Sequence, residues 1–174
     1  MSWRAAACAG LLAATAHPAH AASDDRSKVA EIFADRVSMD DQAQRSRYLG
    51  NVEFTQGSLR LTGDEVELAT REGQLQLLNI SGSPATYREL DDAGQPLRAR
   101  AEKIEYDTAV GLIRLQGDAH LCRGGEYFRS TYIEYNTQTR TVDAGKPEAG
   151  GQDRVHITLR PGNAAPGSGC DEMP

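Results

Sequence analysis

One stretch of the chain, Tyr48–Leu68 (YLGNVEFTQGSLRLTGDEVEL), constrains the fold more than any other. Apolar and polar residues alternate along it, and a period of two is typical of strands with one buried face. Leu61 and Val66 both belong to the apolar set, although the step between them is five residues, an odd number. A straight strand would place them on opposite faces. We therefore predict a corner or bulge between them, which Gly63 permits.

The same unit recurs further along the chain. Gly117–Tyr135 repeats it, because Gly117 stands where the first copy has Gly50, an offset of 67 residues, and Gly82–Tyr106 is a weaker copy. The five-residue step recurs from Phe128 to Ile133. Ordinary strands also resemble one another, but the glycine spacing and the repeated corner favour a stacked repeat. A shorter signature occurs five times, at Asp35–Met39, Asp64–Leu68, Glu102–Tyr106, Thr131–Tyr135 and Asp153–Ile157.

This pattern predicts an all-β domain. Each unit has one apolar face that it cannot bury alone, so the stacked units must form two facing sheets around an apolar interior. Alternation alone does not decide whether that interior is a filled core or an open groove. The first strand, near Ile32–Met39, and the last, near Arg154–Leu159, contain no proline and no lysine run. Their exposed edges are therefore candidate surfaces for the addition of a strand from another chain.

The two ends of the chain differ in composition from the rest. Met1–Arg4 is short and basic, Ala5–Ala16 is apolar with small residues, and Ala19–Ala21 fits an A-x-A cleavage site, so residues 1–21 are expected to be a secretory signal peptide. We expect residues 22–30 to be a flexible segment and 31–160 to be the folded domain. Residues 161–174 are rich in proline and glycine and are expected to be a disordered tail.

Charge and motifs exclude several classes of protein. The formal net charge of −6 argues against a nucleic-acid-binding protein, which needs a basic surface. No apolar run reaches the ~20 residues of a membrane-spanning helix. The sequence contains no G-x-S-x-G, Walker A, H-E-x-x-H or C-x-x-C motif and no zinc-ligand spacing, so we predict neither an enzyme nor a cofactor or metal.

Few residues outside the apolar set could carry chemistry. His120 and His156 fall at outward positions of their strands and are expected to be ordinary surface histidines. Cys122 and Cys170 could form a disulfide in an exported protein. The position of Cys170 in the tail favours a free thiol instead. The acidic pairs Asp40–Asp41 and Asp91–Asp92 are interpreted as turn residues rather than acid–base pairs.

The chain resembles the OstA family of periplasmic lipopolysaccharide-transport proteins. The resemblance rests most on the GN-V-x-x-TQG element after Leu49 and the G-x-PA-x-Y element from Gly82. The matching segments cover about Ile32–Pro161 and are Ala34–Asp40, Tyr48–Leu68, Gly82–Asp107, Leu115–Leu121, Ser130–Asn136 and Arg154–Pro161.

The resemblance implies a fold and a function. The fold would be an antiparallel β-jellyroll that forms an open, V-shaped, twisted trough. The trough would bind the lipid A part of lipopolysaccharide in the periplasm. The protein would associate head to tail with itself, with an inner-membrane partner and with an outer-membrane translocon, all by edge-strand addition, and would not be an enzyme. The remaining alternatives are a β-solenoid carbohydrate-binding protein or enzyme, and a structural periplasmic scaffold with a filled core.

The resemblance also implies roles for named residues. Charge alone suggests Arg36, Arg100 and Lys103 as contacts for lipid phosphates. The implied edge contacts are Ile32, Val37, Met39, Val155, Ile157 and Leu159. The implied trough lining consists of Ile32, Met39, Val52, Phe54, Leu59, Leu61, Val66, Leu68, Tyr87, Ile104, Tyr106, Leu121, Phe128, Ile133 and Tyr135.

Overall fold

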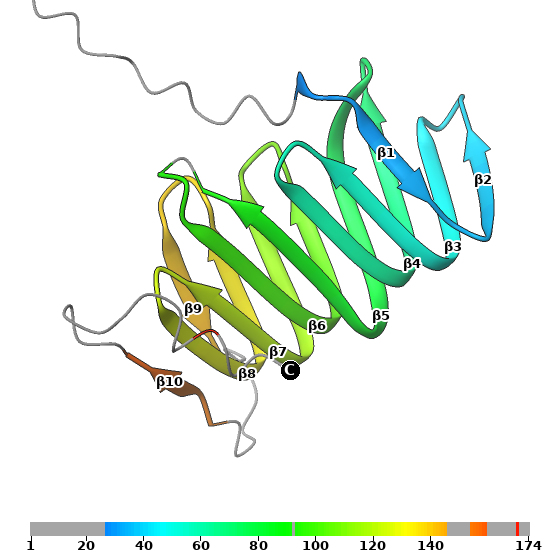
Figure 1. The fold of residues 1–174 in the computed structure, drawn as a ribbon. Helices are drawn as coiled ribbons and strands as arrows, with labels where there is room; N and C mark the ends of the chain where they lie inside the picture. The colour runs from blue at the N-terminus through cyan, green and yellow to red at the C-terminus, as the bar shows by residue number, and fades with distance from the viewer. Residues whose placement is uncertain (1–26, 92, 146–153, 160–169, 171–174) are drawn as a thin grey trace, which may run out of the picture.

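The computed structural model describes residues 27–91, 93–145, 154–159 and 170, and in these ranges the chain forms a single antiparallel sheet of ten strands (Figure 1). The sheet is not closed into a barrel, so the predicted all-β, open antiparallel fold is confirmed. The strands are β1 (Ala30–Phe33), β2 (Arg36–Asp40), β3 (Arg45–Gln56), β4 (Leu59–Arg71), β5 (Gln74–Leu90), β6 (Pro96–Asp107), β7 (Leu112–Arg123), β8 (Glu126–Asn136), β9 (Thr141–Ala144) and β10 (His156–Thr158).

The strand order is a meander in which six long strands each contribute to two halves of the sheet. The order along the sheet is β1-β3-β4-β5-β6-β7-β8-β10, while β2 pairs with the other half of β3 and β9 with the other half of β8. We call the half that begins with β1 arm A and the half that begins with β2 arm B. Arm A comprises residues 30–33, 52–56, 59–63, 85–90, 96–101, 119–123, 126–130 and 156–158, and arm B comprises 36–40, 45–49, 65–71, 74–81, 103–107, 112–116, 132–136 and 141–144.

The corner predicted at Gly63 is present. The β4–β5 register shifts between Thr62 and Glu65, and Leu61 and Val66 are both buried on the same side of the folded sheet. A Cβ atom on Gly63 would lie 2.7 Å from the backbone oxygen of Ser81, so this position requires glycine because the next strand approaches closely.

The predicted repeat is visible in the backbone of β3 and β7. Gly50 and Asn51 have φ angles of 77° and 46°, and Gly117 and Asp118 have 75° and 38°. Both pairs lie where the register shifts, between Leu49 and Val52 in β3 and between Gln116 and Ala119 in β7. The left-handed backbone in each pair makes a bulge that turns the strand from one arm into the other.

Cross-strand register places the apolar residues in continuous rows along the inside of the sheet. Because directly opposed residues share a face, each row follows from the pairing. The arm A row is Ile32, Phe54, Leu61, Tyr87, Ala99, Leu121, Phe128 and Ile157. The facing arm B row is Val37, Tyr48, Val66, Ile80, Ile104, Leu115, Ile133 and Ala144.

The two arms touch through their apolar faces in the middle of the molecule. Val66, Ile104 and Ile133 are completely buried. The rings of Tyr87 in arm A and Tyr106 in arm B meet edge to face, with centroids 5.8 Å apart. The centre is therefore a packed core, in which each fully buried aliphatic side chain contributes about 1.5–3 kcal/mol.

The strand expected near Ile32–Met39 is two strands rather than one. The chain turns between β1 and β2, where the backbone N–H of Asp35 donates to the Gly50 oxygen at 3.0 Å. The Asn51 amide in turn donates to the Asp35 carboxylate at 2.9 Å. The first edge thus follows the corner of β3, with β1 on arm A and β2 on arm B.

Two strand segments were not singled out in the sequence analysis. The first half of β5 follows the turn at Glu72–Gly73, and Leu78 and Ile80 within it belong to the core. The short strand β9 pairs with β8 and provides the last strand of arm B. At the C-terminal end the edges are therefore β9 and β10, and not the segment around β10 alone.

Two expectations about individual residues are wrong. Cys122 and Cys170 form a disulfide, with their Cα atoms 5.6 Å apart, where a free thiol was favoured. His120 does face outward but is only 3% exposed. The Tyr127 ring from the neighbouring strand lies beside the imidazole, with centroids 5.8 Å apart, because cross-strand neighbours can bury an outward side chain.

The remaining predictions on the fold have mixed outcomes. Asp40 and Asp91 accept backbone hydrogen bonds within turns, as expected, from Ala43 at 2.9 Å and from Gln95 at 2.8 Å. In the part of the chain that the structure describes, no helix is long and apolar enough to cross a membrane. The signal peptide expected at 1–21 and almost all of the tail expected at 161–174 lie outside the described residues.

The corner at Gly63 provides a first test. We expect Gly63→Ala to lower the free energy of unfolding by about 1–3 kcal/mol, because the added Cβ overlaps the Ser81 backbone and the Ile80 side chain. Urea denaturation of the purified protein measures the change. The matched control is Glu53→Ala, an exposed outward position on the neighbouring strand, which should stay within about 0.5 kcal/mol of wild type. Equal stability of the two variants would contradict the role given to the corner.

Candidate functional site

A cleft of 740 Å³ opens from the apolar interior between the free rims of the two arms. Phe54 and Leu59 line it from arm A, and Leu68, Leu75 and Tyr106 line it from arm B. Ile32 on β1 contributes to the end nearest the first edge. The cleft is continuous with the buried rows, so it is the accessible part of the same apolar surface.

The rim of the cleft is polar. Glu89 faces the cleft from arm A and accepts a hydrogen bond from the Tyr87 hydroxyl. Gln56 donates to the backbone oxygen of Lys28 at 3.1 Å. On arm B, the Thr108 hydroxyl donates to the Leu75 oxygen at 2.6 Å and holds the β6–β7 turn against β5. An apolar floor beneath a polar rim suits a ligand that has an apolar chain and a polar head.

The structure separates the predicted lining residues into three groups. Ile32, Phe54, Leu59, Leu68 and Tyr106 line the cleft. Met39 is exposed at the β2 edge. The others, Val52, Leu61, Val66, Tyr87, Ile104, Leu121, Phe128, Ile133 and Tyr135, are buried between the arms. Contact of these residues with a lipid remains a prediction.

Sequence reasoning missed part of the cleft. Leu75, Glu89 and Thr108 line it, and each belongs to a strand end or turn at the rim. The Glu72–Gly73 turn signal, followed by Leu75 and Leu77, could have indicated the rim strand. Nothing local to Thr108 indicates that it contacts β5, because that contact crosses more than 30 residues of sequence.

Both ends of the sheet carry exposed apolar side chains. Phe33, Val37 and Met39 are exposed at the β1–β2 end. Ile157 in β10 is also exposed, as are Val155 and Leu159, which lie just outside that strand. The terminal strands have one unpaired edge each among the described residues. All of these residues except Phe33 were predicted as edge contacts, and their role in association remains a prediction.

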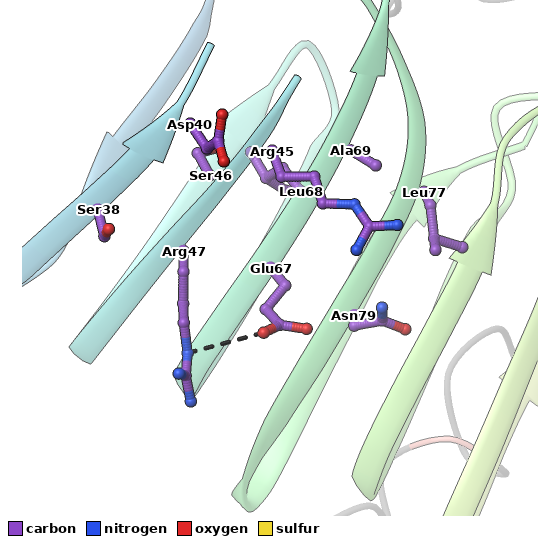
Figure 2. Close-up of a pocket in the computed structure, with 10 residues that line it drawn as sticks. All are labelled: Ser38, Asp40, Arg45, Ser46, Arg47, Glu67, Leu68, Ala69, Leu77 and Asn79. Atoms are coloured by element: carbon purple, nitrogen blue, oxygen red, sulfur yellow. Dashed lines mark ion pairs between the residues drawn. The ribbon is translucent and has the colours of Figure 1, made fainter. Parts of the chain in front are cut away.

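A second, smaller pocket of 240 Å³ lies on the outer face of arm B (Figure 2). Polar side chains such as Arg45, Arg47, Glu67 and Asn79 surround an apolar surface that includes Leu68 and Leu77. The Arg47 guanidinium lies 3.7 Å from Glu67 and 2.5 Å from Glu65. The dashed line in Figure 2 marks the ion pair with Glu67. Most of its lining residues lie on the outer face, and Leu68 also lines the cleft.

Several arginine and glutamate side chains on the outer face of arm B form ion pairs. The Arg114 guanidinium lies between Glu105 at 2.5 Å and Glu134 at 3.0 Å. Burial and the Glu134 carboxylate, 2.5 Å from the phenol, raise the pKa of Tyr132 to about 12. Tyr132 therefore remains a hydrogen-bond donor at all physiological pH values.

The outer face of arm A carries a polar cluster near the last strands, in which His120 and Tyr127 are buried while Asp118 and Arg129 are exposed to solvent. Asp118 Oδ1 lies 3.0 Å from His120 Nε2 and 3.0 Å from the Arg129 guanidinium. Although this contact is close, the buried His120 Nε2 has no hydrogen-bond partner among the described residues. The imidazole Nδ1 lies 2.5 Å from the Tyr127 hydroxyl. Contact with His120, reinforced by Arg129, holds the pKa of the Asp118 carboxyl below its usual range.

No set of three or more His, Cys, Asp or Glu residues within the described ranges could hold a metal ion. The interior instead offers one apolar row from β1 to β10, a second from β2 to β9, a cleft along the rims and, among the described residues, unpaired edges at both ends. These features define an open β-trough protein.

Comparison with known proteins identifies the family. The profile of the LptA/(LptD N-terminal domain) LPS transport protein family matches residues 31–141. The chain belongs to this family, which confirms the resemblance seen in the motifs. The function of the family is transport, in agreement with the expectation that the chain is not an enzyme.

The relatives include proteins of several bacteria. The lipopolysaccharide export system protein LptA of Escherichia coli K12 is 30% identical over 139 residues, which cover 78% of this chain and 75% of the relative. LptH of Pseudomonas aeruginosa is 31% identical over 124 residues, which cover 70% and 71%. A crystal structure of LptH, described as the LptA-homologous periplasmic component of the lipopolysaccharide transport device, superposes with a TM-score of 0.70 at 26% identity. That match covers 79% of this chain and 99% of the LptH chain.

The Asp118 cluster predicts how stability depends on pH. Because the pKa of Asp118 is lower in the folded than in the unfolded chain, its contribution is complete above the unfolded value near 4 and is lost as pH falls through the folded value. We expect Asp118→Asn to reduce stability at pH 7 and to flatten the loss of stability below about pH 4. Urea denaturation at a series of pH values measures both effects. If the variant lost stability below about pH 4 as steeply as wild type, the prediction would be contradicted.

Proposed function

We propose that this protein carries lipopolysaccharide across the periplasm. It shields the lipid A acyl chains between its arms and passes the molecule from an inner-membrane partner to an outer-membrane translocon. The observation that carries the proposal is the pair of apolar rows, one from β1 to β10 in arm A and one from β2 to β9 in arm B, which open to the rims through the cleft. Family membership and the periplasmic LptH structure support this function and location.

The energetics favour an apolar ligand. Each acyl methylene removed from water contributes about 0.8 kcal/mol, so a chain of some ten methylenes gains on the order of 8 kcal/mol. The edge-to-face contact of Tyr87 and Tyr106 joins the two arms. It is worth only about 0.5–1.5 kcal/mol beyond its buried area. Binding at the cleft can therefore offset the separation of the rims and allow chains to move deeper between the arms.

The open edges suggest how the molecules connect. β1 and β2 end the sheet on one side, and β9 and β10 end it on the other. Pairing of the β9–β10 edge of one copy with the β1–β2 edge of the next would extend both apolar rows into the neighbour. The same edges would pair with the inner-membrane partner and the translocon. Export of the protein rests on the signal peptide expected at residues 1–21.

A structural scaffold with a filled core is the second candidate. The complete burial of Val66, Ile104 and Ile133 favours it, because a filled interior leaves no room for a ligand. The two candidates differ in one measurable respect. A carrier must expose its interior to lipid, whereas a scaffold keeps it closed.

Photo-crosslinking in living cells tests the carrier. A photo-reactive amino acid at Leu59 or Leu68, which line the cleft, should trap lipopolysaccharide because these side chains contact the acyl chains. A third probe at the fully buried Ile104 should trap it as well if the arms separate during transport. Immunoblotting of the purified adducts for lipopolysaccharide gives the readout.

The matched control is a probe at Glu53, which precedes Phe54 on the outward face of β3 and should label weakly. Labelling at Leu59 and Leu68 but not at Ile104 would restrict lipid to the cleft. Equal labelling at Glu53 and the inward positions, or none at any position, would overturn the proposal.

Substitution of the first edge tests strand addition. We expect Val37→Lys with Met39→Lys to weaken self-association at least about tenfold, because exposed lysines blunt an edge strand. Sedimentation velocity over a range of protein concentrations measures this, and circular dichroism checks the fold. The control is Val110→Lys, an equally exposed apolar residue in the β6–β7 turn and away from every edge. Unchanged association of the double variant would contradict edge pairing.

A further inference from the structure

Three arginines form a row on the outer face of arm A. Arg60 in β4 lies directly opposite Arg88 in β5, and Arg88 lies directly opposite Arg98 in β6. With strands about 4.8 Å apart, the three Cα atoms lie within roughly 10 Å of one another. We call this set the arginine row.

The row has no anionic partner within the described residues. No ion pair there involves Arg60, Arg88 or Arg98. Like charges directly opposite each other destabilise a sheet. The whole chain is acidic, with a formal net charge of −6, so carboxylates are abundant elsewhere. Three adjacent arginines without an ion pair in the described ranges indicate an anion that this part of the chain does not supply.

The outer face of arm B shows the contrast. There the arginines that sit in cross-strand rows alternate with carboxylates, as Arg114 does between Glu105 and Glu134. Two described carboxylates near the β5 tip already have partners. Glu89 accepts the Tyr87 hydroxyl, and Asp91 lies 3.6 Å from Arg140.

The row lies just behind the rim of the cleft. The Arg60 guanidinium bends toward the hairpin tip and donates to the backbone oxygens of Gly57 at 2.8 Å and Leu59 at 2.9 Å. Leu59 itself lines the cleft. The backbone N–H of Leu90 donates to the Ser58 hydroxyl at 3.0 Å, which holds the β4 and β5 tips together. A head group that leaves the cleft over the arm A rim therefore meets the row.

We propose that the arginine row binds the phosphate groups of the amphiphile whose acyl chains occupy the cleft, so that the head group lies over the rim of arm A. The inference rests on the proposed function. Guanidinium groups bind phosphate oxygens in pairs, with charge-assisted hydrogen bonds that lysine does not match in geometry. The opposite rim carries Arg71 beside Glu72 at the β4–β5 turn, a mixed pair that does not select an anion.

The arginine row differs from the three phosphate contacts that charge alone suggested. Of the candidates Arg36, Arg100 and Lys103, Arg100 already lies 3.5 Å from the Asp118 carboxylate. Arg36 and Lys103 belong to arm B, in the row that also holds Leu49 and Glu65. Neither lies on the arm A rim.

The test compares two lipids and two variants of the full chain. The lipids are purified lipopolysaccharide and the same material after removal of its phosphates. The variant Arg88→Gln with Arg98→Gln should bind intact lipopolysaccharide about ten- to a hundredfold more weakly, with a smaller dependence on salt, because charge-assisted contacts are lost. Adding Arg60→Gln should weaken binding further. Affinity for the dephosphorylated lipid should not change.

The matched control is Arg45→Gln with Arg71→Gln. It removes the same charge from two exposed arginines of arm B that form no ion pair within the described ranges, and it should bind both lipids as wild type does. Thermal unfolding checks that all variants are folded. Wild-type affinity of the arginine-row variant for intact lipopolysaccharide, or an equal loss in the control, overturns the proposal while crosslinking at Leu59 still supports the carrier. Absence of binding of either lipid to the wild-type chain overturns the carrier and the arginine row together.

Discussion

The bend in each long strand is the constraint on which the rest of the structure depends. At Gly63 the backbone of β4 passes so close to Ser81 that no side chain fits, and at Gly50 and Gly117 a left-handed pair turns the strand. These bends make one sheet face itself, so a single apolar surface becomes both walls of the trough. Without them, the alternating pattern would produce a flat sheet with one exposed apolar face.

The interior is both a core and a candidate binding surface, and this dual character has a physical basis. The middle is packed, as the complete burial of Ile104 shows, while the rims diverge around the cleft. A single folded sheet has its strong backbone hydrogen bonds within each arm and only side-chain contacts between the arms. Side-chain contacts can be exchanged for lipid contacts of similar energy, whereas ladder hydrogen bonds cannot.

The outer faces of the two arms differ in how their charges are arranged. On arm B, Arg47 and Arg114 form ion pairs with carboxylates on neighbouring strands. On arm A, the arginine row has no such partner, and the cluster around Asp118 and His120 lies further along. An asymmetric carrier can fix the orientation of its cargo, because the apolar interior alone does not distinguish the two rims.

The sequence by itself determined the all-β class, the corner between Leu61 and Val66, the repeat and the family, because side-chain alternation and glycine spacing are local properties of the chain. Only the tertiary structure decided which strands oppose each other. The burial of His120 beside Tyr127, the bond from Cys122 to Cys170, the cleft at Leu75 and the meeting of Arg88 with Arg98 all depend on cross-strand register or on long separations in sequence. Alternation assigns a residue to a face of the sheet, but the neighbour it meets on that face is fixed by pairing between distant segments.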